Sequence, residues 1–103
     1  MKARISINYE DVAEFCRRWK IIELALFGSV LRDDFRSDSD VDVLVTFAPD
    51  ARPTLFDLVH MEDELASIMC RKVDIVERSA VERSSNHIRR RHVLSNVEAV
   101  YVA

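Results

Sequence analysis

Two apolar runs, separated by a polar segment, constrain the fold of this chain more than any other feature. The first runs from Ile21 to Phe27, and the second from Val41 to Phe47. Both have the length of a β-strand, and the second is rich in β-branched residues. We therefore expect two buried strands, the first ending at Gly28-Ser29 and the second beginning at Asp40.

Two acidic residues stand at the beginning of the second strand. Asp40 and Asp42 are two positions apart, so in a strand they point to one face while Val41 and Val43 point to the other. Carboxylates held together at the start of a buried strand repel each other and lose hydration, and a cation offsets that cost. Their oxygen ligands favour Mg²⁺ or a similar divalent ion.

Gly28 and Ser29 predict the other half of a phosphate site. Glycine lets the backbone come close to a ligand. If a helix begins at this point, its free N–H groups and the serine hydroxyl can bind phosphate oxygens. Metal carboxylates beside such a site suit phosphoryl or nucleotidyl transfer.

These residues resemble a known family. Gly28-Ser29, ten intervening residues and then Asp40-Val41-Asp42 resemble the G-S-x10-D-x-D signature of the DNA polymerase β-like nucleotidyltransferases. The whole chain looks like the stand-alone minimal nucleotidyltransferases of bacteria and archaea. Many of those are antitoxins whose cognate toxin is a helical HEPN ribonuclease. One departure is Asp33, which stands about where such proteins often carry glycine and puts the backbone shape of the linker in question.

The resemblance implies an activity, cofactors and a partner. Two Mg²⁺ ions would be held by Asp40, Asp42 and Asp74, and the triphosphate of ATP would be bound at Gly28 and Ser29. AMP would be transferred to a hydroxyl of the HEPN toxin, a tyrosine by the family's precedent, and the two proteins could form a hetero-oligomer. Asp74 would be the third catalytic carboxylate, which helps to deprotonate that hydroxyl.

The rest of the chain predicts a small mixed sheet with helices on one face, an α/β (α+β) fold in one domain, 1–103, and the resemblance implies that this fold is of the polymerase β-like type. Strand, helix and strand in succession suggest a right-handed crossover, which makes the third strand parallel to the second or close to it. The helix expected to begin at Thr54 has an apolar stripe that is interrupted by Glu62 and consists of Leu55, Leu58, Val59, Leu65, Ala66 and Met69. Three further apolar residues, Phe56, Met61 and Ile68, lie off this stripe and either widen the core face or form a partner surface. The expected elements are helices from Asn8 to Lys20, Val30 to Phe35, Thr54 to Cys70 and Ser79 to Asn96, and strands from Arg71 to Glu77 and Val97 to Val102.

Asp74 lies between Val73 and Ile75 inside the predicted third strand. A charge inside a strand needs a reason. Sharing a metal site with Asp40 and Asp42 is one, and an exposed edge position, paired with a neighbouring base, is the other.

Composition limits the remaining function classes. The net charge of −3 argues against general nucleic-acid binding, although 78–92 holds five arginines and one acid. The chain has no apolar run long enough to span a bilayer and no signal-peptide core at its N-terminus, so a cytoplasmic protein without membrane contact is expected. Cys16 and Cys70 are isolated in helical patterns and are expected to be reduced core residues.

Several alternatives stay open at this stage. A calcium loop beginning at Asp38 is rejected because Val43 and Pro49 stand where that loop needs Gly and Glu, but the acids could still be solvated turn residues. Arg32 and Arg36 flank the phosphate site and either bind the triphosphate or face solvent. The arginines of 89–91 either form a solvated face, or one or two of them meet a triphosphate or an acidic partner. His87 and His92 are spaced poorly for a shared metal. An antitoxin that only masks its toxin, and an RNA-directed nucleotidyltransferase that uses the 78–91 arginines, are the competing functions.

Overall fold

The computed structural model describes residues 7–28, 40–83, 85, 86, 88, 91 and 97–103. Four strands form one mixed sheet in the order β3-β2-β1-β4, in which β2 and β3 are parallel and β1 is antiparallel to both of its neighbours. This confirms the α/β class and the parallel pairing of the second and third strands. The elements in chain order are α1 (Tyr9–Arg18), β1 (Ile21–Phe27), β2 (Val41–Phe47), α2 (Leu55–Met69), β3 (Val73–Glu77), α3 (Arg78–Glu82) and β4 (Val97–Val102).

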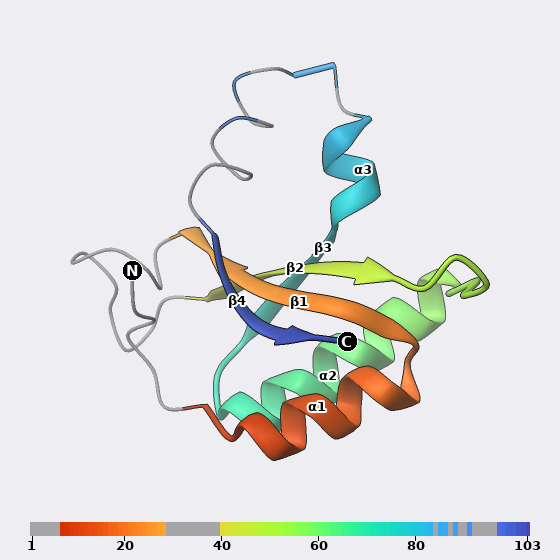
Figure 1. The fold of residues 1–103 in the computed structure, drawn as a ribbon. Coiled ribbons are helices and arrows are strands. Elements are labelled where there is room, and N and C mark those ends of the chain that lie inside the picture. The colour runs from red at the N-terminus through yellow and green to blue at the C-terminus, as the bar shows by residue number, and fades with distance from the viewer. Residues whose placement is uncertain (1–6, 29–39, 84, 87, 89–90, 92–96) are drawn as a thin grey trace.

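The helices α1 and α2 lie together on one face of the sheet (Figure 1), as predicted. Val41, Val43 and Val45 point to this face and are fully buried. The short helix α3 lies on the opposite face, where Val81 packs on Phe27 and Leu44. None of the described helices is long and apolar enough to cross a membrane. The helix expected over 30–35 lies outside the described residues, as does most of 84–96. The helix expected from Ser79 to Asn96 is wrong in its length, because α3 ends at Glu82 and the described residues Arg83, Ser85 and Asn86 are not helical.

Local signals in the sequence account for the ends of both long helices. Asn8 accepts a hydrogen bond from the Asp11 backbone N–H at 3.1 Å, which caps α1 as predicted. Thr54 and Asp57 exchange hydrogen bonds of 3.1 and 2.9 Å between side chain and backbone, a capping box that fixes the start of α2.

The predicted apolar stripe of α2 is partly wrong. Met61, which was placed off the stripe, is fully buried, whereas Leu55 is 77% and Val59 51% exposed. Successive helical residues are about 100° apart, so Val59 lies roughly 200° around the helix from Met61. The face that covers the sheet carries Met61, Leu65 and Met69. Phe56, a candidate for the core, is 80% exposed.

The two cysteines differ, which corrects one prediction. Cys16 is buried and Cys70 is exposed, and both are free thiols. Burial raises the pKa of the Cys16 thiol to about 12. Cys70 lies outside the core because it ends α2 in the left-handed conformation, with φ 55°.

Alkylation of the folded protein is therefore expected at one cysteine. Iodoacetamide at pH 8 reacts with thiolates, so one adduct should form rapidly and map to Cys70, while Cys16 reacts only after unfolding in urea. Peptide mass spectrometry at timed intervals measures this. Equal labelling of both thiols in the native protein would contradict the burial of Cys16.

Glu64 joins the two long helices. Its carboxylate accepts hydrogen bonds from the Arg18 guanidinium and, at 3.1 Å, from Nε1 of Trp19. The hydrogen bond from Arg18 is the main reason that the pKa of Glu64 is lowered below its ordinary value. Because the folded pKa lies below the unfolded one, this contact stabilises the fold above the unfolded pKa, and its contribution is lost as pH falls through the folded pKa.

Glu64→Gln should accordingly flatten the acid end of the stability curve. We expect the urea midpoint of the variant to lie below that of the native protein at pH 7, and the two to converge as pH falls from about 5 to 3. Glu10→Gln on the exposed side of α1 is the control. A difference between native and Glu64→Gln proteins that stays constant over this range would show that Glu64 is not the titrating group.

Candidate active site

Three strands bring Gly28, Asp42 and Asp74 to one end of the sheet. Because β1 is antiparallel to β2, its last residue, Phe27, pairs with Asp42 near the beginning of β2. Because β3 is parallel to β2, Asp74 pairs with Asp42 on the other side. Adjacent strands are about 4.8 Å apart, so the backbones of Asp42 and Asp74 are direct neighbours. Both side chains belong to the face opposite α1 and α2, since Val41, Val43 and Val73 fill the helix-covered core.

Gly28 lies against the Asp42 side chain. Its φ is +79°, a conformation that side-chain-bearing residues rarely adopt. A Cβ at this position would overlap Oδ2 of Asp42 and lie 3.2 Å from its Cγ. The backbone at the end of β1 therefore approaches the carboxylate as closely as glycine permits, and the predicted role of Gly28 in binding phosphate stays a prediction.

The structure does not bring every predicted ligand together. Asp40 is exposed and immediately precedes β2, which begins at Val41 and not at Asp40 as predicted. Among the described residues, no three His, Cys, Asp or Glu side chains converge into a metal-binding group. Asp42 is half-buried, whereas Asp74 is exposed on a strand at the edge of the sheet, as in the alternative that the sequence left open for Asp74.

Ser29 and Arg32, together with Asp33 and Arg36, lie outside the described residues, so their predicted roles stay predictions. The described donors nevertheless fit a divalent cation. Asp42 and Asp74 offer hard oxygen ligands from positions that pair across β2 and β3. Because Gly28 has no Cβ, no side chain of that residue lies between its backbone and the Asp42 carboxylate.

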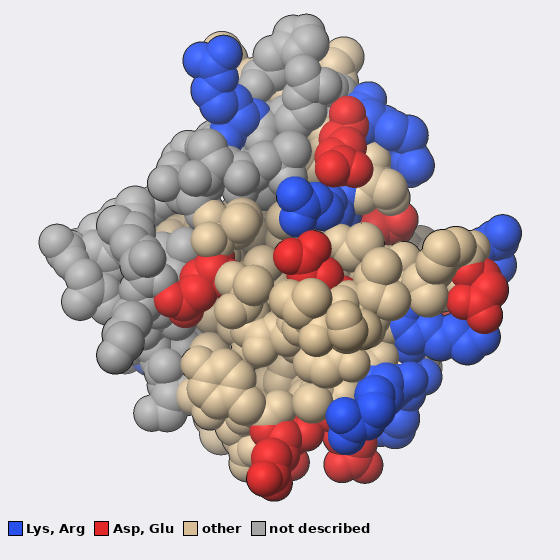
Figure 2. Space-filling model, in the orientation of Figure 1, with Lys and Arg blue, Asp and Glu red and all other residues tan. Residues whose placement is uncertain are grey.

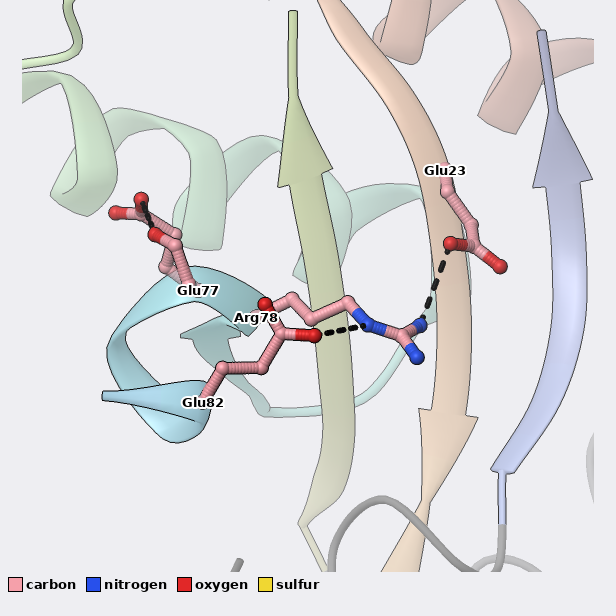
Figure 3. A network of polar contacts seen from close by, with 5 residues as sticks. Glu23, Glu77, Arg78 and Glu82 are labelled. Atoms are coloured by element: carbon pink, nitrogen blue, oxygen red, sulfur yellow. Dashed lines mark hydrogen bonds and ion pairs between the residues drawn. The ribbon is translucent and has the colours of Figure 1, made fainter. Parts of the chain in front are cut away.

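An apolar layer separates these acids from an ionic network on the same face. Leu44 and Val76 follow Asp42 and Asp74 by two positions and pack in the small core around Val81. Beyond them, Figure 3 shows the Arg78 side chain crossing β2 from the start of α3 towards β1. Its guanidinium contacts Glu23 at 3.3 Å and Glu82 at 3.4 Å. The sequence had suggested only a basic segment here, because a contact across 55 residues leaves no local pattern.

The visible surface has no broad charged area. Figure 2 shows basic and acidic side chains interspersed on this side of the molecule, near the middle of the described surface as well as around its margin. Such a distribution does not favour a phosphate-backbone interface.

The sheet topology, the close glycine and the paired carboxylates are the described parts of the predicted nucleotidyl-transferring site. A family model of the nucleotidyltransferase domain matches residues 11–98. The chain therefore belongs to this family, and it is a nucleotidyltransferase.

Similarity to individual proteins agrees with this family. The protein adenylyltransferase MntA of Thermococcus cleftensis is 33% identical over 69 residues, which are 67% of this chain and 68% of the relative. A toxin–antitoxin structure with AMP-PNP superposes with a TM-score of 0.70 at 21% identity, covering 94% of this chain and 75% of that one. The structure of a tri-AMPylated Shewanella oneidensis HEPN toxin in complex with MNT antitoxin superposes with a TM-score of 0.62 at 21% identity. The match covers 93% of this chain and 71% of that one. These two likenesses show the shared fold.

Proposed function

We propose that this nucleotidyltransferase is an antitoxin that transfers AMP from ATP to a hydroxyl of a cognate HEPN toxin. The observation that carries the proposal is the position of Asp42. It lies between Gly28 and Asp74, where β1, β2 and β3 run side by side. The similar adenylyltransferase MntA and the complex that contains an AMPylated toxin support the reaction and the partner.

Each residue of the site has a proposed role. Asp40, Asp42 and Asp74 would hold Mg²⁺, two ions by analogy with two-metal sites. Bound there, Mg²⁺ would neutralise triphosphate charge and lower the pKa of the acceptor hydroxyl. The backbone at Gly28 would lie along the triphosphate, and the Ser29 hydroxyl and Arg32 would bind its oxygens.

The reaction then requires positioning more than covalent chemistry by the protein. The acceptor oxygen forms a bond to the α-phosphorus of ATP, the bond from that phosphorus to the bridging oxygen breaks, and pyrophosphate leaves. Asp74 would accept the hydroxyl proton, and its exposure and its pairing with Asp42 across β2 and β3 support this role. On the basis of the family resemblance, we assign a tyrosine as the acceptor. We assign the reaction to the cytoplasm, because ATP is available there.

Intact mass of the neighbouring gene's product, after co-expression with this protein, tests the proposal. We expect a gain of one or more AMP units and loss of the partner's ribonuclease activity. Peptide mapping would identify the acceptor residue. A partner that remains unmodified when co-expressed with the native chain would refute AMP transfer to it.

A binding-only antitoxin is the second candidate. Leu55, Phe56 and Val59 expose large apolar side chains on one end of α2, and such groups mark protein contacts. A partner that copurifies unmodified and inhibited would favour this function.

A further inference from the structure

Glu62 is an anomaly on α2 that the proposed catalytic residues do not explain. It is half-buried and interrupts a helix whose neighbouring positions, Met61 and Leu65, are fully buried. A carboxylate beside an apolar core loses hydration and needs a hydrogen-bonding partner. The structure supplies one, since Oε2 of Glu62 accepts the backbone N–H of Ile75 at 2.9 Å.

This bond lies on the outer edge of the sheet. Among the described strands, β3 lies at one edge of the sheet and has β2 as its single neighbour. The Lys72 carbonyl accepts the Val41 N–H at 2.9 Å, so Lys72 turns its backbone groups towards β2. Backbone groups alternate in direction along a strand, and Asp74 therefore also faces β2, whereas Ile75 faces outwards to Glu62.

Asp74 is thereby fixed from two sides. Its own backbone belongs to the ladder with Asp42, and the following residue is bonded to α2 through Glu62. A five-residue edge strand has few other backbone bonds to set its position. Displacing a reacting group by about 1 Å can cost roughly a hundredfold in rate.

We propose that Glu62 is a positioning residue that sets the place of Asp74 relative to Asp42, through the Ile75 backbone. This inference rests on the proposed function, because it assigns Asp74 to the reaction. In this role Glu62 acts through its contact with the Ile75 backbone N–H and not on the substrate. Its carboxylate acts as an acceptor, so an amide oxygen in the same place would serve equally.

Two substitutions separate this role from packing. Glu62→Leu removes the acceptor and continues the apolar face, so its thermal midpoint should equal or exceed that of the native protein. Glu62→Gln retains an acceptor oxygen. Asp63→Leu, at the exposed neighbouring position, is the matched control for loss of a carboxylate from α2.

Three readouts are needed. For Glu62→Leu we expect kcat for partner labelling to fall at least tenfold with KM for ATP within about twofold, Mn²⁺ affinity to fall severalfold, and the Ile75 amide to exchange at least tenfold faster. Glu62→Gln should return all three to within about threefold of the native values. Asp63→Leu should change none of them.

The outcomes separate failure of the inference from failure of the proposed function. Native kcat or native Ile75 exchange in Glu62→Leu would overturn the inference, as would a Glu62→Gln variant as impaired as Glu62→Leu. If the Glu62→Leu variant does not fold, amide hydrogen exchange at Ile75 in the native protein provides the test. An Ile75 amide that is not protected from exchange would overturn the inference. If the native protein transfers no AMP, the proposed function fails, while Mn²⁺ affinity and Ile75 exchange still test the positioning of Asp74.

Discussion

Asp42→Asn is expected to reduce AMP transfer by about a thousandfold or more while leaving the fold intact. The substitution keeps the volume of the side chain against Gly28 but removes a charge and replaces one oxygen by a nitrogen donor. Removing a preorganised group from a site where charge develops commonly lowers the catalytic rate by a factor of this size. The rate falls most when the residue acts together with others as a unit. Initial rates of partner labelling, followed by intact mass under saturating ATP, measure the effect.

Asp63→Asn is the control, because it makes the same chemical change at an exposed position on α2. It should transfer AMP at the native rate. The Asp42→Asn protein also decides between the two candidate functions. If it still suppresses the toxin's ribonuclease activity at equal stoichiometry, binding suffices for neutralisation and transfer is secondary. If it transfers AMP at the native rate, the assigned site is wrong.

Gly28→Ala is expected to impair both stability and transfer. The φ of +79° disfavours any residue with a Cβ by about 1–2 kcal/mol, and the added methyl overlaps Asp42 Oδ2. We expect the free energy of unfolding to fall by about 2 kcal/mol or more and the transfer rate to fall about a hundredfold, because Asp42 must move aside.

A double-mutant cycle with Asp42→Ala separates the two causes. In that background the overlapping carboxylate is absent, so Gly28→Ala should cost only the backbone strain. We expect a coupling free energy of about 1 kcal/mol or more between the two positions. A cost of Gly28→Ala that is equal in both backgrounds would show that the methyl group does not meet Asp42.

Local sequence features predicted much of this fold. The caps at Asn8 and Thr54, the alternating valines of β2 and the parallel crossover to β3 all depend on neighbouring residues or on general rules of chain connection. The adjacency of Asp42 and Asp74 follows from the same features, once the register is known. The predictions for these elements are therefore confirmed, apart from shifts of one or two residues at their ends.

Other features depend on contacts that no short pattern encodes. Leu55 and Val59 fit an apolar helical stripe as well as Met61 does, and only the orientation of α2 on the sheet decides which are buried. Cys70 is exposed because the helix ends there. The crossing of Arg78 to Glu23 requires both β1 and α3 to be in place (Figure 3). The metal ligands and the roles of Ser29 and Arg32 stay predictions.

The two ends of the sheet offer different freedom for protein engineering. The loop from Ala48 to Pro53 leaves β2 six residues beyond Asp42, roughly 20 Å along the strand. The Ala48 backbone N–H donates a hydrogen bond to the Lys20 carbonyl, and the Ala103 backbone N–H donates one to the nearby Ile22 carbonyl. Ala103 therefore lies at this same remote end of the sheet. A fluorophore attached near Asp50 would stand clear of the proposed active site around Asp42 and Asp74, so turnover could be followed optically without obstructing that site.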